Sequence, residues 1–181
     1  MHYIFLAGIG NSESEHWQSI WYRSLGSSGH WLEHTDWDNP VAEVWAEDLD
    51  RCLRALSGPK VFIAHSLSCL LVAEWAKRYE GAGVAGSFLV SVPDPKGPAF
   101  PRQAVGFGEG LEGRLPFPTM MVASTNDKYG TMEHAQRVSA HWHSPLVNVG
   151  DKGHINLASG LGDWRQGRAM LDEFVASLTR G

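Results

Sequence analysis

Residues 61 to 69 read Val61-Phe62-Ile63-Ala64-His65-Ser66-Leu67-Ser68-Cys69. An apolar, β-rich run passes here into a helical pattern within two residues, which predicts a buried strand that turns sharply into a helix. Such a turn strains the backbone of its central residue, Ser66, and lifts that side chain clear of the sheet. The positions two before and two after must be small, and they are Ala64 and Ser68. The pattern predicts a nucleophile elbow with Ser66 as the nucleophile.

The elbow departs from the familiar Gly-x-Ser-x-Gly pattern, because Ala64 and Ser68 replace both glycines while keeping the small size. Ser66 also has an alternative role as the cap of the following helix, for which serine is a favoured residue. A serine hydroxyl is a weak nucleophile at neutral pH and needs a base and a group that orients the base. The partners of Ser66 therefore decide between the two roles.

The rest of the chain alternates short apolar runs with longer amphipathic ones, which predicts a mostly parallel central sheet with helices on both faces. We expect one domain, residues 1–181, with a compact α/β-hydrolase fold. Strands are predicted at 3–7, 60–64, 86–92, 119–124 and 146–149, and helices at 13–24, 41–56, 67–79, 131–141 and 164–178. Residues 93–118 hold six of the nine prolines. This segment is the candidate lid, and it is too short for a full cap domain.

The base and the acid follow later strands. In an α/β-hydrolase the catalytic residues come in the order Ser, Asp, His, and the last two lie at the carboxyl ends of strands. Asp127 follows the strand at 119–124 and His154 follows the strand at 146–149. Asp94 also follows a strand, but its neighbouring prolines suit a turn. We predict Asp127 as the acid and His154 as the base.

The other histidines have less specific surroundings. His65 adjoins the nucleophile, and a buried structural role is expected because neighbours at such a turn point apart. His134, His141 and His143 lack a carboxylate or cysteine partner at ligand spacing, so no metal site is expected.

An acyl-transfer site needs N–H groups that stabilise the oxyanion of the tetrahedral intermediate. The N–H of Leu67 is one expected donor. The second is expected from the loop Gly8-Ile9-Gly10-Asn11, from Ile9 or alternatively from Gly10, unless these glycines only form a tight turn. Four residues are predicted to line the substrate pocket, although the two tryptophans have a core role as their alternative: Asn11, His16, Trp17 and Trp37.

Composition indicates which classes of partner and which cellular compartment to expect. The chain is 43% hydrophobic and 19% charged, as in ordinary globular proteins, and its formal charge is −5 with scattered Lys and Arg, which argues against nucleic acid. No apolar stretch is long enough to span a bilayer, and the N-terminus lacks the pattern of a signal peptide. Cys52 and Cys69 lie in helical patterns, which favours free thiols. We expect a cytoplasmic protein without nucleic-acid or membrane partners, whose protein partners are unknown.

Taken together, the motifs resemble the small α/β-hydrolase-fold serine hydrolases that include retinoblastoma-binding protein 9. Four blocks carry the resemblance: Gly8-Ile9-Gly10-Asn11-Ser12 with His16-Trp17-Gln18, Ala64-His65-Ser66-Leu67-Ser68-Cys69, Ala123-Ser124-Thr125-Asn126-Asp127, and Gly153-His154-Ile155-Asn156 with Ser159-Gly160-Leu161-Gly162. The resemblance implies a triad of Ser66, Asp127 and His154, no cofactor and esterase-like activity on small esters. The sequence departs from the family at Ser68, where glycine is more common, and at Lys128, where proline is.

The sequence therefore predicts a carboxylesterase-like serine hydrolase that acts on small ester or acyl substrates through an acyl-enzyme. Two alternatives remain open: a non-catalytic module on the same fold that binds a small molecule or peptide, and an acyltransferase. A thiol enzyme using Cys69 is not expected, because that residue lies within the predicted helix and faces the core.

Overall fold

The computed structural model describes residues 1–81 and 83–180; residues 82 and 181, part of the predicted domain 1–181, lie outside this description. A parallel six-stranded sheet runs through the molecule in the order β2-β1-β3-β4-β5-β6. Its strands are His2–Leu6 (β1), Gly29–Trp31 (β2), Lys60–His65 (β3), Val84–Val90 (β4), Thr119–Ala123 (β5) and Leu146–Asn148 (β6). β3 lies inside the sheet and is buried along its whole length, as parallel strands covered on both faces are.

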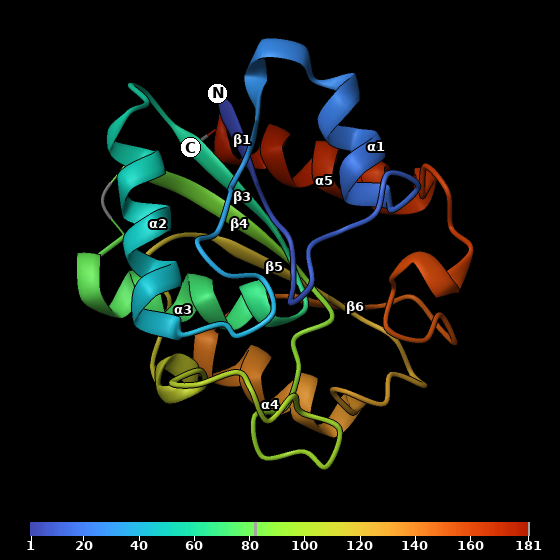
Figure 1. Ribbon diagram of the computed structural model, residues 1–181. Helices are drawn as coiled ribbons and strands as arrows, with labels where there is room; N and C mark the ends of the chain where they lie inside the picture. The colour runs from blue at the N-terminus through green and yellow to red at the C-terminus, as the bar shows by residue number, and fades with distance from the viewer. Residues whose placement is uncertain (82, 181) are drawn as a thin grey trace.

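Helices cover both faces of the sheet (Figure 1). α1 (Trp17–Ser24) and α5 (Arg165–Leu178) pack on one face, and α2 (Ala42–Arg54), α3 (Leu67–Tyr79) and α4 (Met132–Trp142) pack on the other. Side chains alternate between the faces, so Phe62 joins the core under α3 while Ile63 joins the core under α1 and α5. The predicted architecture is confirmed. None of these helices, in the part of the chain described, is both long and apolar enough to cross a membrane.

The first helix begins later than predicted. The acidic residues near Glu13 suggested a start at residue 13, but α1 begins at Trp17. His16 caps it, because the Nδ1 of its ring accepts a hydrogen bond of 3.2 Å from the N–H of Gln18. An imidazole thus takes the capping role that short polar side chains usually fill, and this frees the preceding residues for a loop.

One strand, β2, was missed by the sequence analysis, because its three residues include a glycine and form an edge strand. The other predicted helices and strands agree with the structure to within two residues at each end. Three short 3₁₀ helices complete the described part of the chain: Gly26–Ser28 (η1), Glu109–Leu111 (η2) and Leu157–Ser159 (η3).

The proline-rich segment 93–118 contains η2 and otherwise irregular structure among its residues, all of which are described. It is fastened to the start of α2 by two backbone hydrogen bonds. Val105 donates its N–H to the carbonyl of Pro40, and Ala42 donates to the carbonyl of Val105, each at 2.9 Å. This segment, the strap, supplies part of the pocket wall through Pro93, Ala99, Pro101 and Gln103.

Candidate active site

Ser66 sits between β3 and α3 with φ 56° and ψ −127°, a conformation that L-residues rarely adopt. Its N–H donates to the carbonyl of Val90 at 3.0 Å, which anchors the turn to β4. Its side chain makes no capping hydrogen bond to α3. The helix-cap role is therefore wrong, and Ser66 has the strained backbone that a nucleophile elbow requires.

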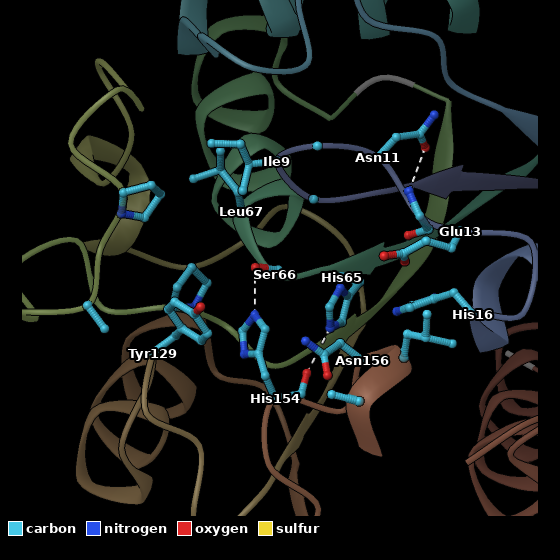
Figure 2. A pocket seen from close by; sticks show the side chains of 18 of the residues that line it. Ile9, Asn11, Glu13, His16, His65, Ser66, Leu67, Tyr129, His154 and Asn156 are labelled. Carbon is cyan, nitrogen blue, oxygen red and sulfur yellow. Dashed lines mark hydrogen bonds between the residues drawn. The ribbon is translucent and has the colours of Figure 1, made fainter. Parts of the chain in front are cut away.

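Three side chains from separate strand ends form a hydrogen-bonded row. Ser66 Oγ lies 2.8 Å from His154 Nε2, and His154 Nδ1 lies 2.8 Å from Asp127 Oδ2 (Figure 2 shows the first contact). Since an ionised carboxylate only accepts, Nδ1 carries the proton and donates it to Asp127. The lone pair of Nε2 then faces the Ser66 hydroxyl and accepts its hydrogen bond.

The carboxylate of Asp127 is held in place by a second donor. Its residue is 5% exposed, and its Oδ1 accepts the N–H of Tyr129 at 2.9 Å. The competing residue, Asp94, instead accepts the N–H of Lys96 and lies 3.6 Å from His134. Asp94 thus shapes a turn, as its proline neighbours suggested.

Two residues just before Asp127 connect the loop that carries Asp127 (residues 124–131) to the loop that carries His154 (residues 149–156, the histidine loop). Ser124 Oγ accepts the N–H of Lys152 at 2.8 Å, and Asn126 Oδ1 accepts the N–H of Gly153 at 2.7 Å. Sequence analysis did not assign these roles. The available signal was their position, because short polar side chains directly after a strand commonly bond to neighbouring backbone.

Two buried aromatic residues hold the backbone around His154. His65 Nε2 lies 2.9 Å from the carbonyl of His154, and Trp17 donates its Nε1–H to the carbonyl of Ile155 at 2.8 Å. Burial, with nearby His154 and His16, lowers the pKa of His65 well below its usual value, so it is a neutral imidazole that donates to the carbonyl. The predicted structural role of His65 fits this arrangement.

Two residues of the pocket lining have backbone N–H groups without an acceptor in the part of the chain described. Within the described residues, neither the N–H of Ile9 nor that of Leu67 has a protein acceptor, and both residues line the cavity. The alternative donor, Gly10, is wrong because its N–H is already bonded to the carbonyl of Trp37 at 3.0 Å. Gly10 has φ 75° and shapes the turn that presents Ile9.

A cavity of about 850 Å³ opens over Ser66. Asn11 and His16 line it as predicted, together with Ile9, Leu67 and Tyr129 (Figure 2). The tryptophan predictions were wrong, because neither residue is part of the lining. Trp17 is 1% exposed beneath the histidine loop, and Trp37 packs against His34 and Trp45. Both therefore serve the core.

The structure supports neither a catalytic thiol nor a metal site among the described residues. Cys69 is buried, and burial raises the pKa of its thiol well above the usual value, so it is not an activated nucleophile. Among residues 1–81 and 83–180 no three His, Cys, Asp or Glu side chains gather at metal-binding distance.

The known proteins that this chain resembles are hydrolases. The model of the serine hydrolase family matches residues 3–173. A comparison with curated proteins gives no significant match. A YdeN-like hydrolase of Pectobacterium atrosepticum superposes with a TM-score of 0.87 at 29% identity, covering 98% of this chain and 91% of that one.

Two further solved structures have the same fold at lower identity. The ydeN gene product of B. subtilis gives a TM-score of 0.80 at 17% identity, covering 97% of this chain and 100% of that one. A thermophilic esterase of Thermogutta terrifontis gives 0.69 at 16%, covering 98% and 90%. The expected α/β-hydrolase fold is confirmed, whereas the particular link to retinoblastoma-binding protein 9 stays a prediction.

Proposed function

Because this chain belongs to the serine hydrolase family, we propose that it is a carboxylesterase-like enzyme that cleaves small esters through an acyl-enzyme on Ser66. One observation carries the proposal: the unbroken row from the Ser66 hydroxyl through the His154 imidazole to the buried Asp127 carboxylate, with both contacts at 2.8 Å. A hydroxyl held against an imidazole that a carboxylate orients is the arrangement that nucleophilic acyl transfer requires.

In the first half-reaction, His154 Nε2 takes the proton of Ser66 while Oγ attacks the ester carbonyl carbon. Asp127 stabilises the imidazolium that forms. The carbonyl oxygen becomes an oxyanion, which accepts hydrogen bonds from Ile9 and Leu67; their N–H groups lack an acceptor among the described residues, which supports this role. As the intermediate collapses, His154 gives its proton to the leaving alcohol, and the acyl group remains on Ser66.

The second half-reaction repeats these steps with water. His154 removes a proton from a water molecule that attacks the acyl carbon, and the proton returns to Ser66 Oγ as the acid leaves. The same acyl-enzyme would react with another acceptor, so adding a competing alcohol and analysing the products separates hydrolysis from acyl transfer.

The proposed substrates are small and uncharged. A cavity of about 850 Å³ falls within the range of small-molecule sites. Its charged lining residues are Glu13 and Asp38, so its charge disfavours anionic substrates. The T. terrifontis protein, described as an esterase, adds support from the fold.

The test is replacement of Ser66 by alanine, with hydrolysis of short chromogenic esters and fluorophosphonate labelling as the two measurements. We expect kcat to fall by about 10⁴-fold or more and labelling to disappear, with an unchanged circular dichroism spectrum. Ser57→Ala, an exposed serine far from the pocket lining, is the control and should keep both. A Ser66→Ala protein that retains wild-type turnover would refute the proposal, as would a wild-type protein that is neither labelled nor active, which leaves the non-catalytic binding module.

We also propose a reducing, cytoplasmic setting and a small-molecule rather than nucleic-acid or membrane partner. Both cysteines are free thiols, Cys69 in the core and Cys52 half-buried, which supports a compartment that keeps thiols reduced. The net charge of −5 supports the absence of a nucleic-acid partner.

A further inference from the structure

The imidazole of His16 presents a buried polar atom for which the proposed mechanism gives no role. The residue is 2% exposed and lines the cavity. Its Nδ1 is occupied, because it caps α1 by accepting the N–H of Gln18. Its Nε2 has no hydrogen-bond partner among the described residues. Buried polar groups are rarely left without a hydrogen-bond partner, so a bound molecule is the candidate partner of Nε2.

The protonation state of His16 follows from its contacts. Burial, together with the nearby His154, lowers the pKa of His16 to about 4, so the ring is neutral at pH 7. A neutral imidazole carries one N–H, and Nδ1 cannot carry it while accepting from Gln18. The proton is therefore on Nε2, which makes His16 an uncharged hydrogen-bond donor at the pocket wall.

His16 belongs to a polar end of the cavity. Glu13 lines the same cavity, and Figure 2 shows His16 lying near Glu13 and His65 on the side of the pocket away from Tyr129. The cavity wall contains no Lys or Arg among the residues the structure describes. This end therefore offers an uncharged donor and no cation, which suits an uncharged group with a free acceptor oxygen, such as a hydroxyl.

The polar end lies within reach of an ester attacked by Ser66. The ring centroids of His16 and His65 are 5.0 Å apart, and those of His65 and His154 are also 5.0 Å apart. His16 and Ser66 line the same cavity, so a hydroxyl on one arm of an ester bound there can approach His16.

We propose that His16 is a specificity-determining residue whose Nε2–H binds the hydroxyl oxygen of one arm of the substrate, so that the enzyme prefers hydroxyl-bearing esters over their alkyl counterparts. This inference rests on the proposed esterase function. An alkyl arm would leave the buried N–H unpaired, and a site built to pair with a hydroxyl discriminates against a substrate that lacks it.

Two matched substrate pairs test the preference on each arm. On the alcohol arm, 2-hydroxyethyl butanoate is compared with propyl butanoate, which replaces the hydroxyl by a methyl group of similar size. On the acyl arm, propyl 3-hydroxybutanoate is compared with propyl 3-methylbutanoate. The measured quantity is the ratio of kcat/KM within each pair, so changes that affect all substrates equally cancel.

Two substitutions separate the two nitrogens of His16. In His16→Asn the amide replaces Nδ1, and asparagine is a strong helix cap, but no donor reaches the position of Nε2. In His16→Gln the amide reaches that position while the cap is weakened. His141→Asn makes the same chemical change at an exposed position of α4 outside the pocket lining and is the control.

For one of the two pairs, we expect the kcat/KM ratio of the wild type to be about 2- to 10-fold higher than that of His16→Asn, which is the size of one net hydrogen bond. His141→Asn should keep the wild-type ratio, and His16→Gln should keep most of it. The pair that responds identifies the arm. Equal ratios in wild type and His16→Asn for both pairs would overturn this inference. If those esters are still cleaved with dependence on Ser66, the proposed function survives; loss of all Ser66-dependent turnover in the wild type would instead refute the proposed function.

Discussion

Replacing Ser68 by alanine tests how the loop at residues 8–11, which carries the proposed donor Ile9, is held against the turn at Ser66. Ser68, in the first turn of α3, is fully buried and donates its hydroxyl to the carbonyl of Ala7 at 2.6 Å. Ala7 is also fully buried and directly precedes the loop that carries Ile9. The bond therefore links the helix after the nucleophile to the loop that supplies the second proposed oxyanion donor. It also gives a reason for a serine at a position where related elbows have glycine.

The magnitude follows from what the substitution leaves behind. Removing the hydroxyl deprives a buried carbonyl of this donor, which costs about 1–3 kcal/mol. For a domain of this size each 1 kcal/mol lowers Tm by about 2–4 °C, so we expect a decrease of about 2–12 °C. Displacement of Ile9 by a fraction of an ångström should also lower kcat by about 10-fold, because the loss of one oxyanion donor costs about 10²–10³-fold.

Thermal unfolding and ester hydrolysis of Ser68→Ala measure both effects. Ser177→Ala is the matched control, because its hydroxyl also donates at 2.6 Å to a carbonyl, that of Phe174, but near the surface end of α5. The control should lose less than about 0.5 kcal/mol. A Ser68→Ala protein with wild-type Tm and kcat would refute the idea that this hydroxyl fastens the loop.

Two further predictions concern pH and the space around the nucleophile. Burial lowers the pKa of both His16 and His34 to about 4, so between pH 6.5 and 5 the unfolded chain binds protons that the folded chain does not. The free energy of unfolding should therefore fall by about 1.6 kcal/mol per histidine over this range, which lowers the urea midpoint. His34→Phe should reduce this decrease, and a urea midpoint independent of pH would contradict the prediction. At Gly8, an added Cβ would lie 3.0 Å from Ser66 Cβ, so Gly8→Ala should shift the nucleophile by a few tenths of an ångström and lower kcat about 10-fold; an unchanged kcat would contradict this close approach.

The parts of the site that the sequence made predictable depend on local rules. The size limits at Ala64 and Ser68 identify the elbow from nine residues of sequence, and its φ of 56° at Ser66 agrees. The positions of Asp127 and His154 follow from chain order, because parallel strands bring their carboxyl ends to one edge. The hydrophobic pattern predicted a mostly parallel sheet, and this was enough to expect the three side chains at one edge without the order of the strands.

The parts that were not predictable depend on tertiary partners. Gly10 and Ile9 are neighbours in one loop, and only the carbonyl of Trp37, distant in sequence, decides which N–H stays free. Trp17 and Trp37 have the aromatic character of pocket residues, yet the histidine loop and α2 bury them. No pattern in a single sequence shows which face of a helix or loop another segment will cover.

The errors in the predicted start of α1 and at the missed strand β2 have similar causes. The start of α1 was placed at Glu13 because acidic residues favour first turns, but the ring of His16, an uncommon cap, begins the helix at Trp17. β2 has too few residues for a period to show, and it forms by pairing with β1.

The strand order divides the reaction chemistry between two contiguous blocks. β2-β1-β3-β4 carries the proposed nucleophile and both proposed oxyanion donors, whereas β5-β6 carries the proposed acid and base. The strap at 93–118 is the single covalent crossing between the blocks. A break introduced there yields two polypeptides, neither of which contains a complete hydrolytic apparatus, so turnover becomes a readout of their reassembly. The fold thereby supplies a natural cleavage point for a split-enzyme reporter.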